Sequence, residues 1–350
     1  MGMFDRRSGG FSRACVLLGA LACGESREPQ TTLDPTGISV TSASASASAS
    51  DSDDDGGIDS GDVLDIGNAT VGSSADGGEG GDCPCENVLD GIYVLDSNEP
   101  PSVKFYDPVT NQFSLVGNLG CDAPLGAVAN SMAIDRAGNA WLNYYVTDGF
   151  DYTGFLYTAP LSDLGSCADL GYLGNGSWYL MGMGYSVDGN GSSCDTLFLY
   201  NSDQYVNYPD FLPGGSQLAK WVESADTKMI VGPTNYPVGE LTGTGDGRLF
   251  AFATVGTNQS VLVQLDKADG SEVDVHPLDG LDITNAFAFG FWGGDVYFFT
   301  ETSPGSGNSK VTRLDLDGTD GGGLAVVNAN TGLSITGAGV STCASFVPPA

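Results

Sequence analysis

Short runs of alternating apolar and polar residues, separated by glycine and aspartate turns, fill the chain from about residue 88 to residue 343. Alternation with a period of two is typical of β-strands, and helical periodicity is absent from this region. One run recurs along the chain and is rich in small residues. Its copies are SMAID (131–135), LMGMGYSVD (180–188), ELTGTGD (240–246), AFAFGFWG (286–293) and ITGAGVST (335–342). Small residues at alternate positions are what strands crowded around a central channel need.

The arrangement of the other strand-like runs indicates a closed ring. Three of them follow each of the first four small-residue copies, and none follows the fifth. Three runs without an inner partner lie instead at the other end, as IYVLD (92–96), SVKFYD (102–107) and FSLVG (113–117). The count closes only if the C-terminal strand completes the N-terminal blade. The sequence therefore predicts an all-β fold, a five-bladed β-propeller over residues 83–350.

The first 22 residues are typical of an export signal, with three arginines before an apolar run that is too short to span a bilayer. The segment Ala20-Leu21-Ala22-Cys23 resembles the lipobox of bacterial lipoproteins. That resemblance implies a signal peptide over 1–22, acylation of Cys23 and a bacterial cell-envelope location, periplasmic or surface-exposed. The same residues also satisfy an A-x-A cleavage site, which would leave Cys23 unmodified.

Residues 23–82 are predicted to form a disordered tether. Residues 24–82 contain no aromatic side chain and carry 13 acidic residues against Arg27 alone, so they cannot bury enough apolar surface to fold. Five aspartates in this segment fall at the ligand positions of an EF-hand-like loop: Asp51, Asp53, Asp55, Asp59 and Asp62. Their flanks are a Ser-Ala repeat and glycine-rich coil instead of helices. We therefore predict no cofactor, with calcium as the minor alternative.

The composition restricts the partners. The chain has 52 glycines, which suit a β-rich protein with many tight turns. Its formal net charge of −32 excludes a nucleic-acid partner, because phosphate binding needs a basic patch. The expected partners are a membrane, through the lipid anchor, and an unknown protein or glycan.

The cysteine count favours an oxidising compartment. Of 8 cysteines, Cys15 leaves with the predicted signal, and acylation of Cys23 would leave an even set: Cys83, Cys85, Cys121, Cys167, Cys194 and Cys343. An unmodified Cys23 would leave one thiol over. Ring closure predicts one bridge from Cys343 to the Cys83/Cys85 pair. The second expected bridge joins Cys167 to Cys194, and Cys121 takes the N-terminal cysteine that is left.

Two segments resemble NHL-type and kelch-like propellers of bacterial envelope lipoproteins. They are IDRAGNAWL (134–142), similar to the NHL strand–turn–strand pattern, and FYDPVTNQFSLVG (105–117), similar to an outer hairpin of such repeats. The resemblance implies the architecture. It implies little about function, because propellers host unrelated activities.

Candidate catalytic residues are few. His276, the only histidine, lies in an expected outer strand. Asp135, Asp188 and Asp246 each end an inner strand before a glycine-containing turn, and aspartate caps such turns. Glu240 is the one credible acid in the channel, and general acid–base catalysis would need a second group beside it.

The loops predict a recognition surface. Short turns should lie at one end of the propeller, and long loops with aromatic residues at the other: Phe150, Tyr152, Trp178, Tyr179, Tyr205, Tyr208, Phe211 and Tyr236. Such aromatics either bind a ligand or pack the loops together, and the sequence favours neither. The leading hypothesis is a non-catalytic, envelope-anchored binding module that uses the long-loop face. The alternative is a propeller enzyme, a glycoside hydrolase or lyase that uses channel carboxylates, and a third possibility is a scaffold with no specific ligand.

Overall fold

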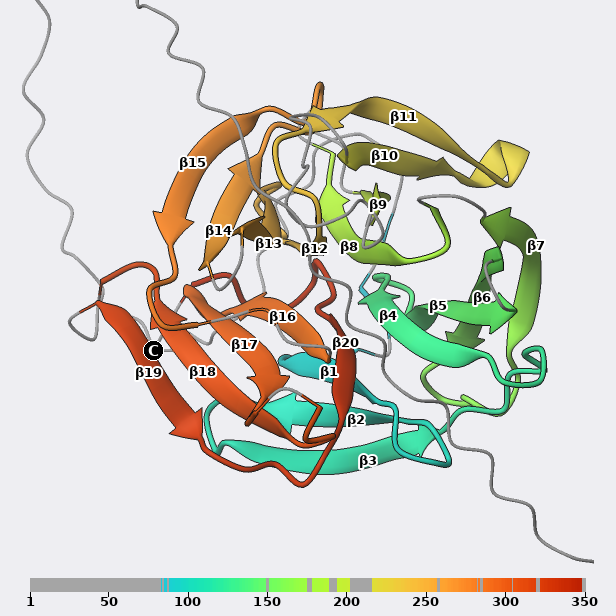
Figure 1. Ribbon diagram of the computed structural model, residues 1–350, viewed down its shortest axis with the longest axis horizontal. Helices are drawn as coiled ribbons and strands as arrows, with labels where there is room; N and C mark the ends of the chain where they lie inside the picture. The colour runs from blue at the N-terminus through green and yellow to red at the C-terminus, as the bar shows by residue number, and fades with distance from the viewer. Residues whose placement is uncertain are drawn as a thin grey trace, which may run out of the picture. The chain divides into compact units, whose positions relative to one another are not determined.

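The computed structural model describes residues 83, 85–86, 88–148, 151–174, 178–188, 194–201, 216–256, 259–281, 283, 286–303, 305–318 and 322–347. Within these residues, antiparallel four-stranded sheets stand around a common axis as the five blades of a propeller (Figure 1). The all-β, five-bladed fold predicted from the repeat is confirmed. The predicted signal, Cys23, the tether and its five aspartates lie outside the described residues.

The blades follow one another in chain order. From its innermost to its outermost strand, blade 1 consists of β20 (Ile335–Gly339), β1 (Ile92–Asp96), β2 (Ser102–Asp107) and β3 (Gln112–Asn118). In the same order, blade 2 consists of β4 (Val128–Ile134), β5 (Asn139–Asp148), β6 (Asp151–Pro160) and β7 (Ala168–Gly174). Blade 3 consists of β8 (Met181–Val187), β9 (Asp195–Asn201), β10 (Ser216–Val222) and β11 (Thr227–Thr234), with the 3-10 turn η2 (Glu223–Ala225) between β10 and β11. Blade 4 consists of β12 (Gly239–Gly243), β13 (Leu249–Gly256), β14 (Gln259–Leu265) and β15 (Glu272–Pro277). Blade 5 consists of β16 (Phe287–Trp292), β17 (Asp295–Glu301), β18 (Ser309–Asp315) and β19 (Gly323–Asn328).

The hydrophobic core lies between neighbouring blades. Inner strands such as β12 and β16 are buried at every position, whereas the outermost strands β3 and β15 have no buried position. Between blades 4 and 5, the Phe250 and Phe291 rings stack with centroids 5.7 Å apart, and Phe252 meets Phe298 edge-on at 4.8 Å. Each blade therefore depends on its neighbours for burial of its apolar faces.

The small residues of the inner strands permit close contact between strands. A Cβ atom added at Gly182 would lie 2.5 Å from the carbonyl oxygen of Gly239, and one at Gly184 would lie 2.9 Å from the Cα atom of Thr242. Only glycine allows β8 and β12 to approach this closely. This is the crowding around the axis that the repeat predicted.

The C-terminal strand closes the ring. β20 pairs antiparallel with β1, with Tyr93 opposite Gly339 and Leu95 opposite Gly337. A covalent bond reinforces this closure, because Cys85 forms a disulfide with Cys343, directly beyond β20. Closure by the C-terminal strand and the first expected bridge are both confirmed.

The other two expected bridges are wrong. Cys194 pairs with Cys83 instead of Cys167, and Cys121 pairs with Cys167. The expected pairs assumed that cysteines pair only when their connections emerge at the same end of the propeller. Strands twist by roughly 20–25° per neighbour, so the outermost strand of a blade is turned far from the innermost one. The chain beyond β3 thus reaches the β6–β7 turn of the next blade, where Gly120 N–H donates to Leu164 O at 3.0 Å.

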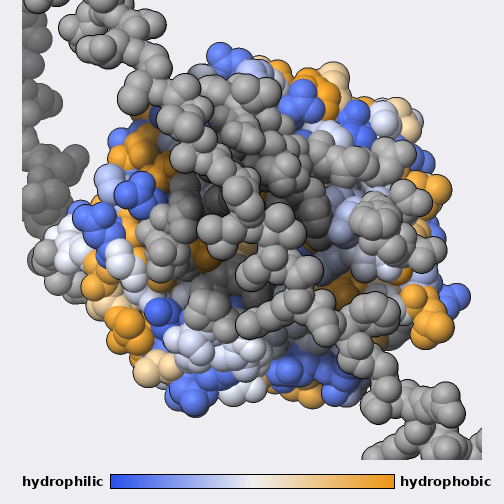
Figure 2. Space-filling model, in the orientation of Figure 1, coloured by the Kyte–Doolittle hydropathy of each residue, from blue (hydrophilic) through white to orange (hydrophobic). Residues whose placement is uncertain are grey.

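The outermost strands expose apolar side chains around the rim. On the face shown in Figure 2, apolar residues form separate spots instead of one continuous patch. Every outermost strand contributes at least one such residue that is more than two-fifths exposed: Leu115, Leu173, Met229, Ile230, Val273 and Val326. Isolated apolar residues of this kind are common on soluble proteins and do not define a site.

Candidate functional site

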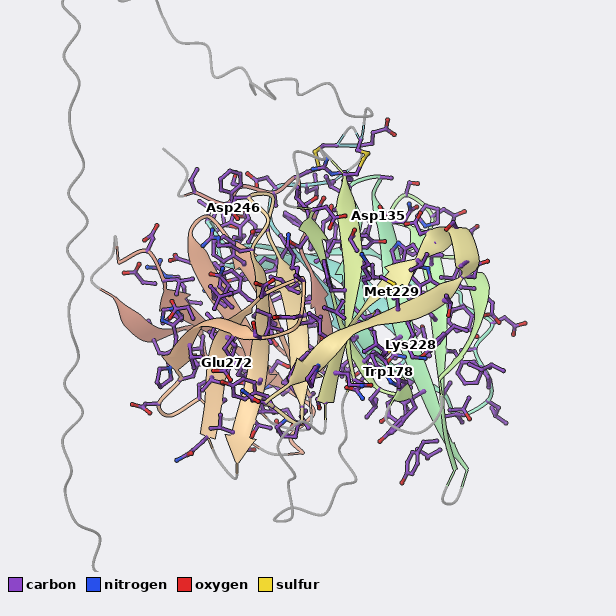
Figure 3. All side chains as sticks on the ribbon, turned by 90° about the horizontal axis from the view of Figure 1, so that it is seen from above. Asp135, Trp178, Lys228, Met229, Asp246 and Glu272 are labelled. Carbon is purple, nitrogen blue, oxygen red and sulfur yellow. A yellow bond between two sulfur atoms is a disulfide. The ribbon has the colours of Figure 1, made fainter. Side chains whose placement is uncertain are left out.

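The two ends of the propeller differ. We call the end with the β4–β5, β12–β13 and β14–β15 turns the short-turn end, and the end with the β1–β2, β5–β6, β7–β8 and β11–β12 connections the long-loop end. Asp135 and Asp246 lie toward the first, and Trp178 toward the second (Figure 3). Disulfides lie at the short-turn end, where Cys83 and Cys85 join blade 3 and the closing strand.

Arg136 links several segments of the chain at the short-turn end. Its guanidinium group donates to Cys83 O at 2.9 Å and to Thr342 Oγ1 at 3.3 Å, and lies 3.8 Å from Asp195 Oδ2. Thr342 donates to the same Asp195 oxygen at 2.7 Å. Burial raises the pKa of Asp195, against the opposing effects of Thr342 and Arg136. The N-terminal segment, the closing strand and blades 2 and 3 are thus fastened together.

Glu240, the predicted channel acid, is buried. It begins on β12 in blade 4 and reaches Ser131 on β4 in blade 2, whose hydroxyl donates to Glu240 Oε2 at 2.9 Å. Backbone N–H groups of Met183 and Leu241 also donate to the carboxyl group. Burial raises the pKa of Glu240 well above its ordinary value, although these three hydrogen bonds oppose the shift. The side chain therefore connects three blades across the axis.

The aromatic residues expected at the long-loop end divide into three groups. Trp178, Tyr179 and Tyr236 are buried, with at most 9% of their surface exposed, so they adopt the packing role that the sequence left open. Tyr152 is partly exposed. The rest lie outside the described residues: Phe150, Tyr205, Tyr208 and Phe211.

Trp178 packs under a lysine that the sequence did not single out. Lys228 on β11 places its Nζ atom 5.1 Å from the Trp178 ring centroid and 5.2 Å from that of Tyr172 (Figure 3). Burial lowers the pKa of Lys228. The cation–π contacts join blades 2 and 3 near the long-loop end. No local pattern predicts this pairing, because Tyr172 and Lys228 are far apart in the chain.

Three tyrosines form a cluster at the long-loop end, which we call the tyrosine platform: Tyr145, Tyr152 and Tyr179. The Tyr152 and Tyr179 ring centroids lie 4.8 Å apart with a 31° tilt, and Tyr145 meets Tyr179 at 6.0 Å. Tyr179 is buried at 3% exposure, whereas the other two are partly exposed. Sequence reasoning missed Tyr145. The pattern that could have identified Tyr145 is the alternation along β5, which places Asn143 and Tyr145 on the same face of the strand.

Hydrogen bonds with Asn143 hold the backbone around Tyr179. Asn143 is fully buried and donates through Nδ2 to Tyr179 O at 3.2 Å. Its Oδ1 accepts from Met181 N–H and from Nδ2 of the partly exposed Asn130, both at 3.2 Å. Gly154 leaves room for Tyr179, since a Cβ atom there would lie 2.4 Å from Tyr179 O. The platform is therefore held by the framework of blades 2 and 3.

The three aspartates at the ends of inner strands accept hydrogen bonds from residues of the turn or strand that follows. Asp135 accepts from the Asn139 N–H at 2.7 Å and from Trp141 Nε1 at 3.2 Å. Asp188 accepts from Thr196 Oγ1 at 2.8 Å, and Asp246 accepts from Arg248 Nε at 3.0 Å. These contacts match the turn-capping interpretation. His276 lies on the outermost strand β15 as expected, with its Nε2 3.0 Å from Asp274 Oδ2.

Within the described residues, one group of carboxylates has the spacing of a cation site. Asp295, Asp315 and Asp317 in blade 5 have oxygens within 4.8 Å of one another. Arg313 Nε lies 3.2 Å from Asp295 Oδ2 and offsets part of the negative charge. Burial, opposed by Arg313 and reinforced by the two neighbouring aspartates, raises the pKa of Asp295 to about 6. Carboxylate oxygens of this kind suit calcium or magnesium.

No protein-family model and no curated protein matches the chain. Among solved structures, TolB from Acinetobacter baumannii matches with 15% identity and a TM-score of 0.38, over 68% of this chain and 52% of that one. This chain therefore spans about half the length of that TolB chain. Regucalcin from Agrobacterium tumefaciens, a calcium-binding protein, matches with 12% identity and a TM-score of 0.39, over 70% and 76% of the two chains. A fucose-specific lectin from Aleuria aurantia matches with 15% identity and a TM-score of 0.33, over 74% and 87%.

Across the part of the chain that the structure describes, no helix has both the length and the apolar character needed to cross a bilayer.

Proposed function

We propose that the chain is a non-catalytic binding module of the bacterial cell envelope, lipid-anchored through Cys23, that recognises a protein or glycan with its long-loop end. The observation that carries the proposal is the position of the N-terminal attachment. Cys83 and Cys85 are bonded to Cys194 and Cys343 at the short-turn end. The chain therefore enters the propeller at the short-turn end, and an anchor that precedes Cys83 leaves the long-loop end free of the attachment.

The character of the long-loop end supports recognition. The β5 and β6 strands extend over ten residues each and carry partly exposed tyrosines on a rigid framework. Rigid aromatic side chains provide contact area at a low cost in conformational entropy. The competing proposal, an enzyme that uses channel carboxylates, depends on Glu240, whose carboxyl group is buried and hydrogen-bonded.

The anchor is tested by Cys23→Ser. We expect the substitution to move the protein from the membrane fraction to the soluble fraction, because acylation needs the cysteine thiol. Cys15→Ser, within the predicted signal, is the matched control and should leave the membrane association unchanged. A wild-type protein that is already soluble, or an unmodified Cys23 in mass spectrometry, would contradict the anchor.

Epitope insertions in the full chain test which end of the propeller binds the ligand. An epitope inserted between Asp148 and Asp151, in the β5–β6 connection, should abolish binding to whichever member of a panel of glycans and envelope proteins binds the wild type. The matched insertion in the β14–β15 turn, between Asp266 and Ser271, lies at the short-turn end and should leave binding intact. Both variants should keep the wild-type melting temperature.

Two results would overturn the proposal. One is equal binding by the two insertion variants. The other is a turnover of any panel glycan that Glu240→Gln abolishes while binding persists, because this would identify a catalytic carboxyl group and favour the enzyme.

A further inference from the structure

The tyrosine platform has a buried centre and two partly exposed rings at its edge. Tyr179 is buried, and its backbone is held by Asn143 and seated on Gly154. The Tyr145 and Tyr152 rings both pack against the Tyr179 ring and remain partly exposed. A ligand that contacts these two rings meets surfaces whose positions are already set, so little conformational entropy is lost on binding.

Two of the polar side chains near the platform are uncharged. Asn130, bonded to Asn143 Oδ1 through one N–H, is partly exposed, and Thr147, two residues beyond Tyr145 on the same face of β5, is exposed. Amide and hydroxyl groups donate and accept hydrogen bonds without a charge. Thr147 also lies directly opposite Tyr152 in the β5–β6 pairing, so a neutral hydrogen-bonding group stands beside an apolar ring face.

The ligand chemistry that fits this arrangement is a sugar ring. One face of a pyranose presents C–H groups that pack on an aromatic ring, and its hydroxyls bond to amides and phenols at the edge. The net charge of −32 disfavours anionic sugars. We infer that the tyrosine platform is the binding site for a neutral oligosaccharide, with Tyr145 and Tyr152 as the stacking residues and Asn130 as a hydroxyl-bonding residue. This inference rests on the proposed recognition at the long-loop end.

The test uses isothermal titration of the full chain with chitohexaose and cellohexaose as neutral probes, a galacturonic acid hexamer as the anionic probe and an oligolysine peptide as the basic one. We expect at least one neutral probe to bind. Tyr152→Ala and Tyr145→Ala should each weaken that binding about tenfold or more, as at a hot spot. Tyr152→Phe should retain most of the affinity because it keeps the ring.

The control is Phe346→Ala, which removes a 40%-exposed aromatic side chain near the short-turn end. It should bind as the wild type does. Melting temperatures measured for each variant separate lost binding from lost folding, and Tyr152→Phe gives a folded reference at the same position.

The outcomes separate the two proposals. If neither neutral probe binds, or if the alanine variants bind as the wild type does, the oligosaccharide assignment is overturned. If a basic or protein ligand is then blocked by the β5–β6 insertion, the proposed function stands without this assignment. If that insertion blocks nothing, both proposals fail.

Discussion

Deletion of residues 334–350, combined with Cys85→Ser to avoid a free thiol, is expected to abolish cooperative unfolding of the propeller. The deletion removes β20, whose Ile335 and Ala338 are buried, and leaves blade 1 without an inner strand. It also removes the Cys85–Cys343 bridge, and loss of a native disulfide typically costs about 2–5 kcal/mol. The bridge alone is a substantial part of the roughly 5–15 kcal/mol by which native proteins are stable, and the loss of β20 adds to it.

The measurement is thermal unfolding followed by far-UV and near-UV circular dichroism. Two controls separate the contributions of strand and bridge. Cys85→Ser with Cys343→Ser keeps β20 and should lower the melting temperature while unfolding stays cooperative. Removal of residues 347–350 alone, beyond the exposed Phe346, should change little. A deletion variant that melts cooperatively near the wild-type temperature would show that blade 1 is stable without the C-terminal strand.

The five-bladed architecture could be predicted because the inner strand of every blade must pack closely against its neighbours around the axis. Backbones approach so closely there that Gly182 and Gly184 admit no side chain, and the other inner strands show the same preference for small residues. This requirement appears in the sequence as a repeat. The bridge at the closure was predictable for a related reason, since ring closure brings the two ends of the propeller together, and Cys85 precedes β1 while Cys343 follows β20.

Contacts between outer strands were not predictable from the same reasoning. The Cys121–Cys167 bridge depends on the accumulated twist of β3 relative to blade 2, and twist leaves no local mark in the sequence. The candidate site was predicted in part. Loop composition indicated aromatic residues at the long-loop end, but it did not separate the buried Trp178 and Tyr236 from the partly exposed Tyr152. Burial of a loop aromatic depends on what crosses it, as Lys228 crosses Trp178.

Glu240 makes the stability of the propeller depend on pH. Burial raises the pKa of its carboxyl group well above the ordinary 4.5, so the folded chain holds this proton to higher pH than the unfolded chain does. The contribution of Glu240 to the free energy of unfolding is therefore complete below about pH 4.5 and is lost as pH rises through the folded-state pKa. One group of this kind changes the free energy of unfolding by at most about 1.4 kcal/mol per pH unit.

Glu240→Gln isolates this effect because glutamine has nearly the same size and never ionises. Urea unfolding at pH 4.5, 5.5, 6.5 and 7.5 should show the wild type losing stability relative to the variant as pH rises. The pKa values of Asp195 and Asp295 are raised as well, but both residues are present in the two proteins, so their effects cancel in the difference. A difference that stays constant across this range would mean that the carboxyl group connecting blades 2, 3 and 4 ionises as it does in the unfolded chain. The hydrogen bonds from Ser131, Met183 and Leu241 would then offset the whole cost of its burial.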